Sequence, residues 1–225
     1  AVSATVGGSV SAAETWVRNG ETVSLAAVPE EGYGFWGWVG DTEGIADVSS
    51  ASIAVAVTSA RTLRAVFAPT GADASVQYVA MTGDDANDGY SDESPKRTIQ
   101  AAVDALANGP GHGMVRVAEG RYETANSGSI AVSDKAVANV VVTNAIAIVG
   151  ATGDPEDVIV RNTSSFNNAQ VIVLYLNHPE AFAANLTLES AHRNAPEPPF
   201  GGNVSIDAAG GTVSNCILRK AVSIG

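Results

Sequence analysis

Three five-residue stretches decide the fold: EDVIV at residues 156–160, ANLTL at 184–188 and SNCIL at 214–218. Each puts a polar turn residue directly before a short apolar run, and this turn residue recurs after 28 and then 30 positions. Irregular repeats of this length, with short strands and variable loops, are typical of a solenoid in which each coil buries the next. Asn185 and Asn215 occupy equivalent turn positions, so they are predicted to stack as a side-chain ladder.

The chain around these stretches is built in the same way. Short apolar runs alternate with Gly, Asn, Asp and Ser, and no long helix intervenes. Such a pattern predicts a mainly β fold. The predicted strands are 114–118, 138–142, 145–149, 158–160, 171–174, 186–188, 204–206 and 213–218.

One segment has helical periodicity. Ser94 can cap a helix and Pro95 is tolerated at the first helical position, so the helix is predicted to start there. Gly109 follows as a stop signal. The sequence thus predicts one amphipathic helix of about a dozen residues, placed to cover the first coil. Its apolar stripe is formed by Ile99, Ala102, Val103 and Leu106.

The second part of the chain carries a family resemblance. Tyr78-Val79-Ala80, Ser94-Pro95, TIQAA at 98–102 and VRVAEGRY at 115–122 resemble the start of the pectate-lyase-like right-handed parallel β-helix superfamily. The resemblance covers residues 76–225 and implies an N-terminal cap followed by the first coils. That superfamily includes polysaccharide lyases, glycoside hydrolases and non-catalytic adhesins, so the resemblance does not specify an activity.

Residues 1–69 are predicted to form a separate all-β module. Alternating runs at 22–28, 52–57 and 62–67 read as strands, and the last two are predicted to pair as a hairpin. The segment 32–38 contains four aromatic residues, which could stack on sugar rings or fill a small core. We favour the core, with Phe35 and one indole inside.

This module also carries a resemblance. GGSV at 7–10, GETVSL at 20–25, GYGF at 32–35 and LRAVF at 63–67 resemble the divergent internalin-B-type bacterial repeat. The resemblance implies a compact β module, with a β-grasp-like fold as one option, that serves as a spacer or adhesive unit. Residues 70–75 are small and polar and carry the composition of a linker.

The segment 83–91, here called the acidic loop, is the densest cluster of oxygen ligands. Calcium prefers six to eight oxygen ligands, so the sequence predicts a Ca²⁺ site formed by Asp84, Asp85, Asn87 and Asp88. The alternative is that these side chains accept hydrogen bonds from backbone N–H groups in consecutive turns.

No catalytic residue is assigned. Polyuronate lyases of that superfamily pair calcium with a basic residue, but Arg161, Arg193, Arg219 and Lys220 match no transferable motif. Glycoside hydrolysis needs two carboxylates flanking the scissile bond, whereas the acidic residues here read as turn residues. They are Asp154, Glu156, Asp157, Glu180, Glu189, Glu197 and Asp207.

Composition limits the partners. The net charge of −12 excludes a nucleic-acid surface, because such surfaces rely on Lys and Arg. No apolar run approaches the roughly 20 residues that span a bilayer, so membrane insertion is not predicted. The three histidines have no zinc-ligand spacing, and Cys216 reads as a small buried hydrophobe.

We therefore expect a bacterial secreted or cell-surface protein, an adhesion or carbohydrate-interacting scaffold whose partner is a polysaccharide or a host or cell-surface glycan. The alternative is a carbohydrate-active enzyme, a polysaccharide lyase or glycoside hydrolase, with catalytic coils largely beyond residue 225. Because the sequence stops in mid-coil, the natural protein is expected to be longer.

Overall fold

The computed structural model describes residues 1–5, 7–11, 17–69, 76–124, 128–134, 136–163, 170–190 and 202–219. The chain divides into two compact units, Ala1–Ser75 and Val76–Gly225. The predicted linker at 70–75 lies outside the described residues. Strands account for 50% of the chain and helix for 6%, which confirms the predicted mainly β class.

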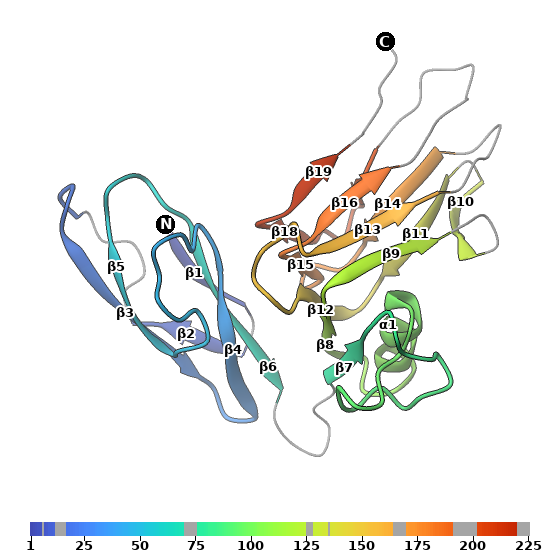
Figure 1. The fold of residues 1–225 in the computed structure, drawn as a ribbon, viewed down its shortest axis with the longest axis horizontal. Coiled ribbons are helices and arrows are strands. Elements are labelled where there is room, and N and C mark those ends of the chain that lie inside the picture. The colour runs from blue at the N-terminus through green and yellow to red at the C-terminus, as the bar shows by residue number, and fades with distance from the viewer. Residues whose placement is uncertain are drawn as a thin grey trace, which may run out of the picture. The chain divides into compact units, whose positions relative to one another are not determined.

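The first unit contains two three-stranded sheets (Figure 1). In one, the order is β1-β6-β4, with β1 parallel and β4 antiparallel to β6. In the other, the order is β2-β3-β5 and all pairs are antiparallel. The strands are β1 Val2–Ala4, β2 Gly8–Val10, β3 Thr22–Pro29, β4 Tyr33–Gly40, β5 Ser52–Ala56 and β6 Leu63–Pro69.

The predicted hairpin between the last two strands of this unit is wrong. Strand β5 pairs with β3, whereas β6 pairs with β1 and β4 in the other sheet. The physical reason is that both strands carry an apolar face, and Ile53 of β5 and Leu63 of β6 bury those faces in one shared core. The described part of residues 1–75 contains no helix, so the helix of a β-grasp fold is not present in it.

The aromatic segment of the first unit fills its core, as predicted. Trp38 is buried, and its indole N–H donates to Ser50 O at 3.0 Å. The Phe35 ring lies 5.7 Å from the Trp38 ring and 5.8 Å from Phe67. A Cβ atom at Gly8 would lie 2.5 Å from the Phe67 ring, so a glycine is required for this packing.

The second unit is a β-solenoid of about four turns. The coils build three sheets, with orders β7-β8-β12-β15-β18, β9-β13-β16-β19 and β10-β11-β14-β17. All pairs are parallel except the antiparallel β10–β11. The strands are β7 Val76–Val79, β8 His112–Val117, β9 Gly120–Thr124, β10 Ile130–Ser133, β11 Ala136–Val142, β12 Ala145–Gly150, β13 Val158–Asn162, β14 Gln170–Leu176, β15 Phe182–Ala184, β16 Thr187–Ser190, β17 Val204–Ile206, β18 Thr212–Ser214 and β19 Ile217–Arg219.

The repeat register read from the sequence is confirmed. Val160 of β13 pairs with Leu188 of β16, which pairs with Leu218 of β19. These are equivalent positions in the three quoted stretches. The run 213–218, however, is two strands of different sheets, because the chain turns at Asn215, whose φ is 44°.

The predicted helix is present, but it begins later than expected. Helix α1 spans Ile99–Asn108 and is capped by Thr98, whose side chain accepts a hydrogen bond from Ala101 N. Pro95 and Lys96 are excluded from the helix because their carbonyl groups bond to the acidic loop and to Ala80 N.

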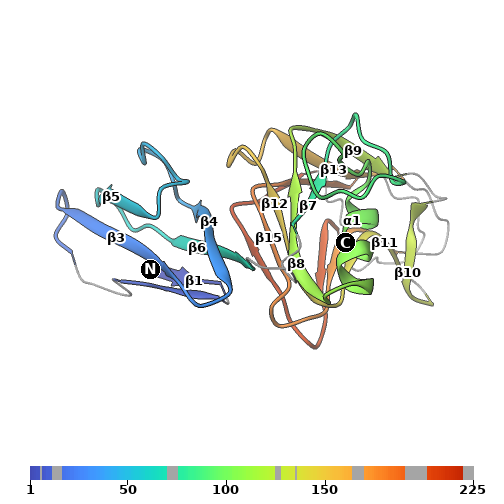
Figure 2. The same ribbon diagram turned by 90° about the horizontal axis from the view of Figure 1, so that it is seen from below.

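Helix α1 covers the first coil. Figure 2 shows it beside β8 and β11, both of which it contacts. All four residues of the predicted stripe are buried in the main core of the solenoid, among them Leu106. Burying side chains of this size contributes about 1.5–3 kcal/mol for each large aliphatic residue.

Candidate functional site

The outer face of the β9–β13–β16–β19 sheet carries alternating charges in register. Glu123 pairs with Arg161, Arg161 with Glu189, and Glu189 with Arg219 along the four strands. We call these four residues the charge ladder. Neighbouring strands lie about 4.8 Å apart, so each inner member lies between two side chains of opposite charge.

The ladder is held together by ion pairs, and Arg121 of β9 joins it. Glu123 Oε1 lies 2.7 Å from Arg121 Nε and 3.2 Å from Arg161 Nη1. Glu189 Oε1 lies 3.1 Å from Arg121 Nη2 and 3.3 Å from Arg161 Nε. The Glu189 side chain is only 4% exposed, whereas that of Glu123 is 43% exposed.

This pairing shifts the pKa values of Glu123 and Arg121 on β9. The hydrogen bond from Arg121 lowers the pKa of the Glu123 carboxyl, and the same bond raises the pKa of Arg121. A general acid in glycoside hydrolysis has its pKa raised instead. Glu123 is therefore electrostatically suited to hold arginines and unsuited to donate a proton to a leaving group.

Arg219 of the ladder and several of the other candidate acids also have partners among the described residues. Arg219 forms an ion pair with Glu156. Asp207 accepts a hydrogen bond from the Tyr175 hydroxyl at 2.5 Å, which lowers the pKa of Asp207 and raises that of Tyr175. The candidates outside the described residues are Arg193, Glu197 and Lys220.

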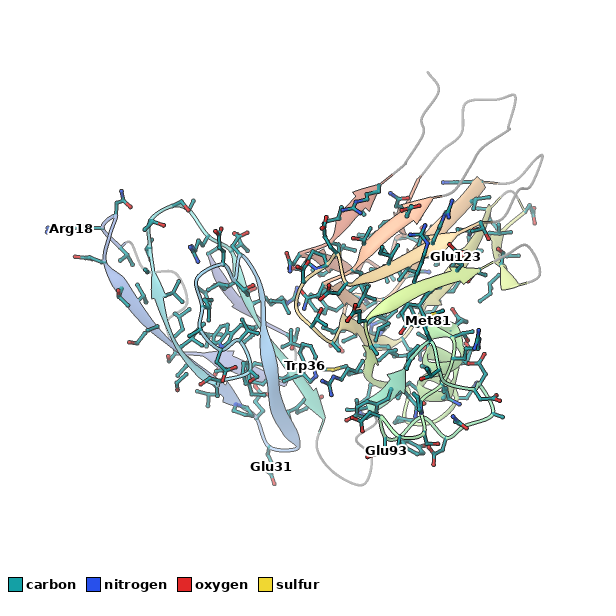
Figure 3. All side chains as sticks on the ribbon, in the orientation of Figure 1. Arg18, Glu31, Trp36, Met81, Glu93 and Glu123 are labelled. Atoms are coloured by element: carbon teal, nitrogen blue, oxygen red, sulfur yellow. The ribbon has the colours of Figure 1, made fainter. Side chains whose placement is uncertain are left out.

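A cleft of about 750 Å³ lies between the cap and the first coil. Strand β9 forms one wall through Arg121–Thr124, and Arg97–Gln100 with Met81 form the opposite wall. Figure 3 labels Glu123 on β9 and Met81 in the cap. Sites for small ligands typically have volumes of 300–1,000 Å³, so this cleft has the size of a binding site.

The polar groups of the cleft divide into engaged and free ones. Asp85 Oδ1 accepts from the backbone N–H groups of Arg97 and Thr98 at 3.0 and 2.8 Å, and Asp85 Oδ2 accepts from the Thr98 hydroxyl. Asn139 is 2% exposed and donates to Arg161 O, yet no described residue donates to its Oδ1. Leaving a buried acceptor without a partner costs about 1–3 kcal/mol.

The other predicted metal ligands form hydrogen bonds that stabilise the turns of the acidic loop. Asp84 Oδ1 accepts from Ala86 N at 2.9 Å, and Asp88 Oδ1 accepts from Tyr90 N at 3.1 Å. The Asn87 amide donates to a backbone carbonyl, that of residue 95, at 2.8 Å. The described residues contain no group of three His, Cys, Asp or Glu side chains that converge on one ion position. Calcium binding at this loop stays a prediction.

Lys96 puts a positive charge inside the acidic loop. The residue is buried, and its ammonium group donates to Asn87 O at 2.6 Å and to Asp85 O at 3.2 Å. Carbonyl oxygens of this kind are also ligands for hard cations. The sequence offered no signal for this contact, because Lys96 was placed inside the predicted helix.

The turn asparagines are structural, as predicted. Asn215 Nδ2 donates to Asn185 Oδ1 at 2.9 Å, and both residues have positive φ angles. Burial raises the pKa of the neighbouring Cys216 thiol to about 11, so this thiol is unreactive at neutral pH. His112 and His178 bond locally, to Pro110 O and to a backbone N–H, and His192 lies outside the described residues.

Comparisons with known proteins identify the first unit only. Residues 1–71 match the family model of the divergent InlB B-repeat domain, which confirms the resemblance of this segment. Repeats of this type are typical of bacterial surface proteins. No curated protein and no solved structure matches the chain. Among the described residues, no helix is long and apolar enough to cross a membrane.

Proposed function

We propose that this chain is part of an extracellular, non-catalytic bacterial scaffold that contacts a polysaccharide or a host or cell-surface glycan. The observation that carries the proposal is the charge ladder, in which Glu123, Arg161 and Glu189 are engaged with one another and with Arg121. An acid–base catalyst needs side chains free to exchange protons with a substrate. The repeat at the N-terminus supports a surface location.

The acidic loop supplies a surface for the glycan. Tyr90 is 64% exposed, and its backbone N–H is held by Asp88 Oδ1 at 3.1 Å. A tyrosine ring offers a flat apolar face with a polar hydroxyl, which suits stacking on a sugar ring. The capped turns reduce the entropy that this loop would lose on binding, because the ring is presented from an ordered backbone.

Glycan binding is tested by incubating the chain with immobilised polyuronates and neutral polysaccharides, with and without calcium. We expect retention without release of products, and weaker retention of the Tyr90→Ala variant than of the control Tyr33→Ala. Release of unsaturated, ultraviolet-absorbing oligosaccharides would instead establish the enzymatic alternative, a pectate-lyase-like polysaccharide lyase. Release of reducing sugars without unsaturation would point to a glycoside hydrolase.

A further inference from the structure

Strand β9 has a free edge in the described part of the chain. The other two sheets extend beyond the first coil through β7 and β10, whereas β9 is the last strand of its sheet. The Gly120 N–H and the Thr124 C=O both bond to the β13 side. Because backbone polar groups alternate sides along a strand, those of Arg121 and Glu123 point to the opposite edge, where no described residue bonds to them.

The free edge opens into the cleft. Residues 121–124 of β9 form one wall, and Met81 borders the start of the strand. A Cβ atom at Gly120 would lie 2.6 Å from Met81 Cγ, so the glycine permits this close approach. Met81 is 41% exposed, and a flexible thioether adapts to a variety of side chains. An extended segment that matches β9 would contain about five residues.

The remaining hydrogen-bonding capacity of the cleft suits a peptide. The guanidinium of Arg97 uses Nη1 to bond Met81 O at 3.2 Å, and no described residue accepts from its other nitrogens. Asn139 Oδ1 also lacks a partner among the described residues, but it is buried beneath the surface of the cleft. Asp85 accepts with both carboxylate oxygens, and the contacts of Glu123 with described residues are made by Oε1, so the open cationic donors of the cleft are those of the Arg97 guanidinium.

A sugar fits this cleft less well than a peptide. Tyr122 is the one aromatic residue in its described lining, and its ring is buried with the hydroxyl bonded to Ala118 O at 2.8 Å. Burial raises the pKa of Tyr122 to about 12, so the phenol stays neutral. A strand edge presents alternating N–H and C=O groups, which are the complement of an extended backbone.

We propose that the cleft binds an extended peptide of about five residues as an additional strand on the free edge of β9. An acidic side chain of the peptide pairs with Arg97. The net charge of −12 disfavours an acidic partner at long range. Screening limits that repulsion to about 8 Å at physiological ionic strength, so contacts within the cleft decide the preference.

The probe is the fluorescein-labelled peptide acetyl-Thr-Val-Asp-Val-Thr-amide, measured by fluorescence anisotropy with the full chain. We expect saturable binding, at least tenfold weaker when the internal amides are N-methylated, because methylation removes the strand hydrogen bonds. Equal binding of the methylated peptide, no binding of the parent peptide, or displacement by a neutral oligosaccharide would each overturn the proposal.

Variants locate the site. Glu123→Pro removes an edge-facing N–H, and Glu123→Gln removes only the carboxylate, so their difference isolates the backbone contact. We expect binding at least tenfold weaker for Glu123→Pro than for Glu123→Gln. Arg97→Glu should weaken binding by a similar factor, whereas the control Arg18→Glu, an exposed charge in the first unit, should not. If Glu123→Pro does not fold, the Arg97→Glu variant provides the test. An Arg97→Glu variant that binds the peptide as tightly as the parent protein contradicts the proposal.

Discussion

In the acidic loop, Asp84 and Asp88 accept hydrogen bonds from backbone N–H groups two residues away, whereas in the charge ladder carboxylates accept from guanidinium groups of other coils. Asp84 and Asp88 act within two residues of their own positions. Glu189 is bonded to Arg121, which is 68 residues away. In the cap, backbone groups close in sequence therefore compensate the clustered negative charge. In the coils, the strand register brings the compensating guanidinium groups together.

This difference predicts different responses to substitution. Local caps are exposed and replaceable by water, so each contributes little. A buried ion pair leaves its partner charge uncompensated when one side is removed. The loop should therefore tolerate the loss of a carboxylate better than the inner part of the ladder does. The tryptophans are Trp16, Trp36 and Trp38, so tryptophan fluorescence reports the first unit and circular dichroism reports both.

The largest effect is expected at the centre of the ladder. Glu189→Ala should lower the free energy of unfolding of the second unit by about 1.5–3 kcal/mol, because it removes a buried carboxylate that contacts the guanidinium groups of Arg121 and Arg161. Glu123→Ala, at the exposed end, should cost less than about 1 kcal/mol. Urea unfolding followed by circular dichroism measures both. Equal losses would show that burial does not set the strength of these pairs.

Lys96 gives the next largest effect. Lys96→Met keeps the buried stem but leaves the carbonyl groups of Asp85 and Asn87 without their ammonium donor. Hydrogen bonds to charged groups contribute about 1.5–3 kcal/mol, so we expect a loss of about 2 kcal/mol. The neighbouring exposed Arg97→Met should cost no more than about 0.5 kcal/mol. A Lys96→Met variant as stable as the parent would mean that the loop does not need this charge.

The solenoid could be predicted because the pattern that encodes it is local in the sequence and repeats along the chain. The turn before Val158, Leu186 and Cys216 fixed the register, which the strand pairing confirms. Extending that alignment by one residue places Arg161, Glu189 and Arg219 side by side. The ladder was therefore readable from the sequence, although these residues were considered only as separate candidates.

Other features depend on contacts that no local pattern encodes. The pairing of β5 with β3 follows from how two apolar faces meet in the core. The alternation of apolar and polar residues in β5 would be the same whether it paired with β3 or with β6. The start of α1 at Ile99 follows from Lys96 pairing with Val79, a tertiary contact that overrides the Ser94-Pro95 start signal. The cleft beside β9 could not be predicted for the same reason, since it lies between two elements distant in sequence.

A smaller effect is expected from the caps of the acidic loop. Asp84→Ala combined with Asp88→Ala removes two Asx-type hydrogen bonds, and we expect a combined loss of about 1–2 kcal/mol. Because the carboxylates already have donors, addition of a calcium chelator should leave the parent's unfolding midpoint unchanged. Thermal unfolding with chelator and with calcium measures both effects.

The calcium prediction has a distinct signature in the same experiment. Calcium at one hundred times its dissociation constant would stabilise the parent by about 2.7 kcal/mol. That gain would be absent from the variant with both substitutions. A calcium-dependent rise confined to the parent would establish the metal site and exclude a purely capping role for these carboxylates.

The smallest effect concerns the pH dependence of the exposed end of the ladder. Arg121 lowers the pKa of Glu123 below its ordinary value of about 4.3. A carboxyl group whose pKa is depressed in the folded state stabilises the fold fully above the pKa of the unfolded state, and this contribution is lost as the pH falls through the folded pKa. The difference in unfolding free energy between the parent and Glu123→Gln should therefore be constant from pH 7 to about 5, shrink below about pH 4.3 and vanish at lower pH. Because Glu123 is well exposed, we expect this difference to stay below about 1 kcal/mol and to decrease in 1 M salt. Urea unfolding across this pH range measures it, with Glu180→Gln as a control outside the ladder. A difference that persists to pH 3 would show that Glu123 acts through packing of its side chain and that its charge contributes nothing.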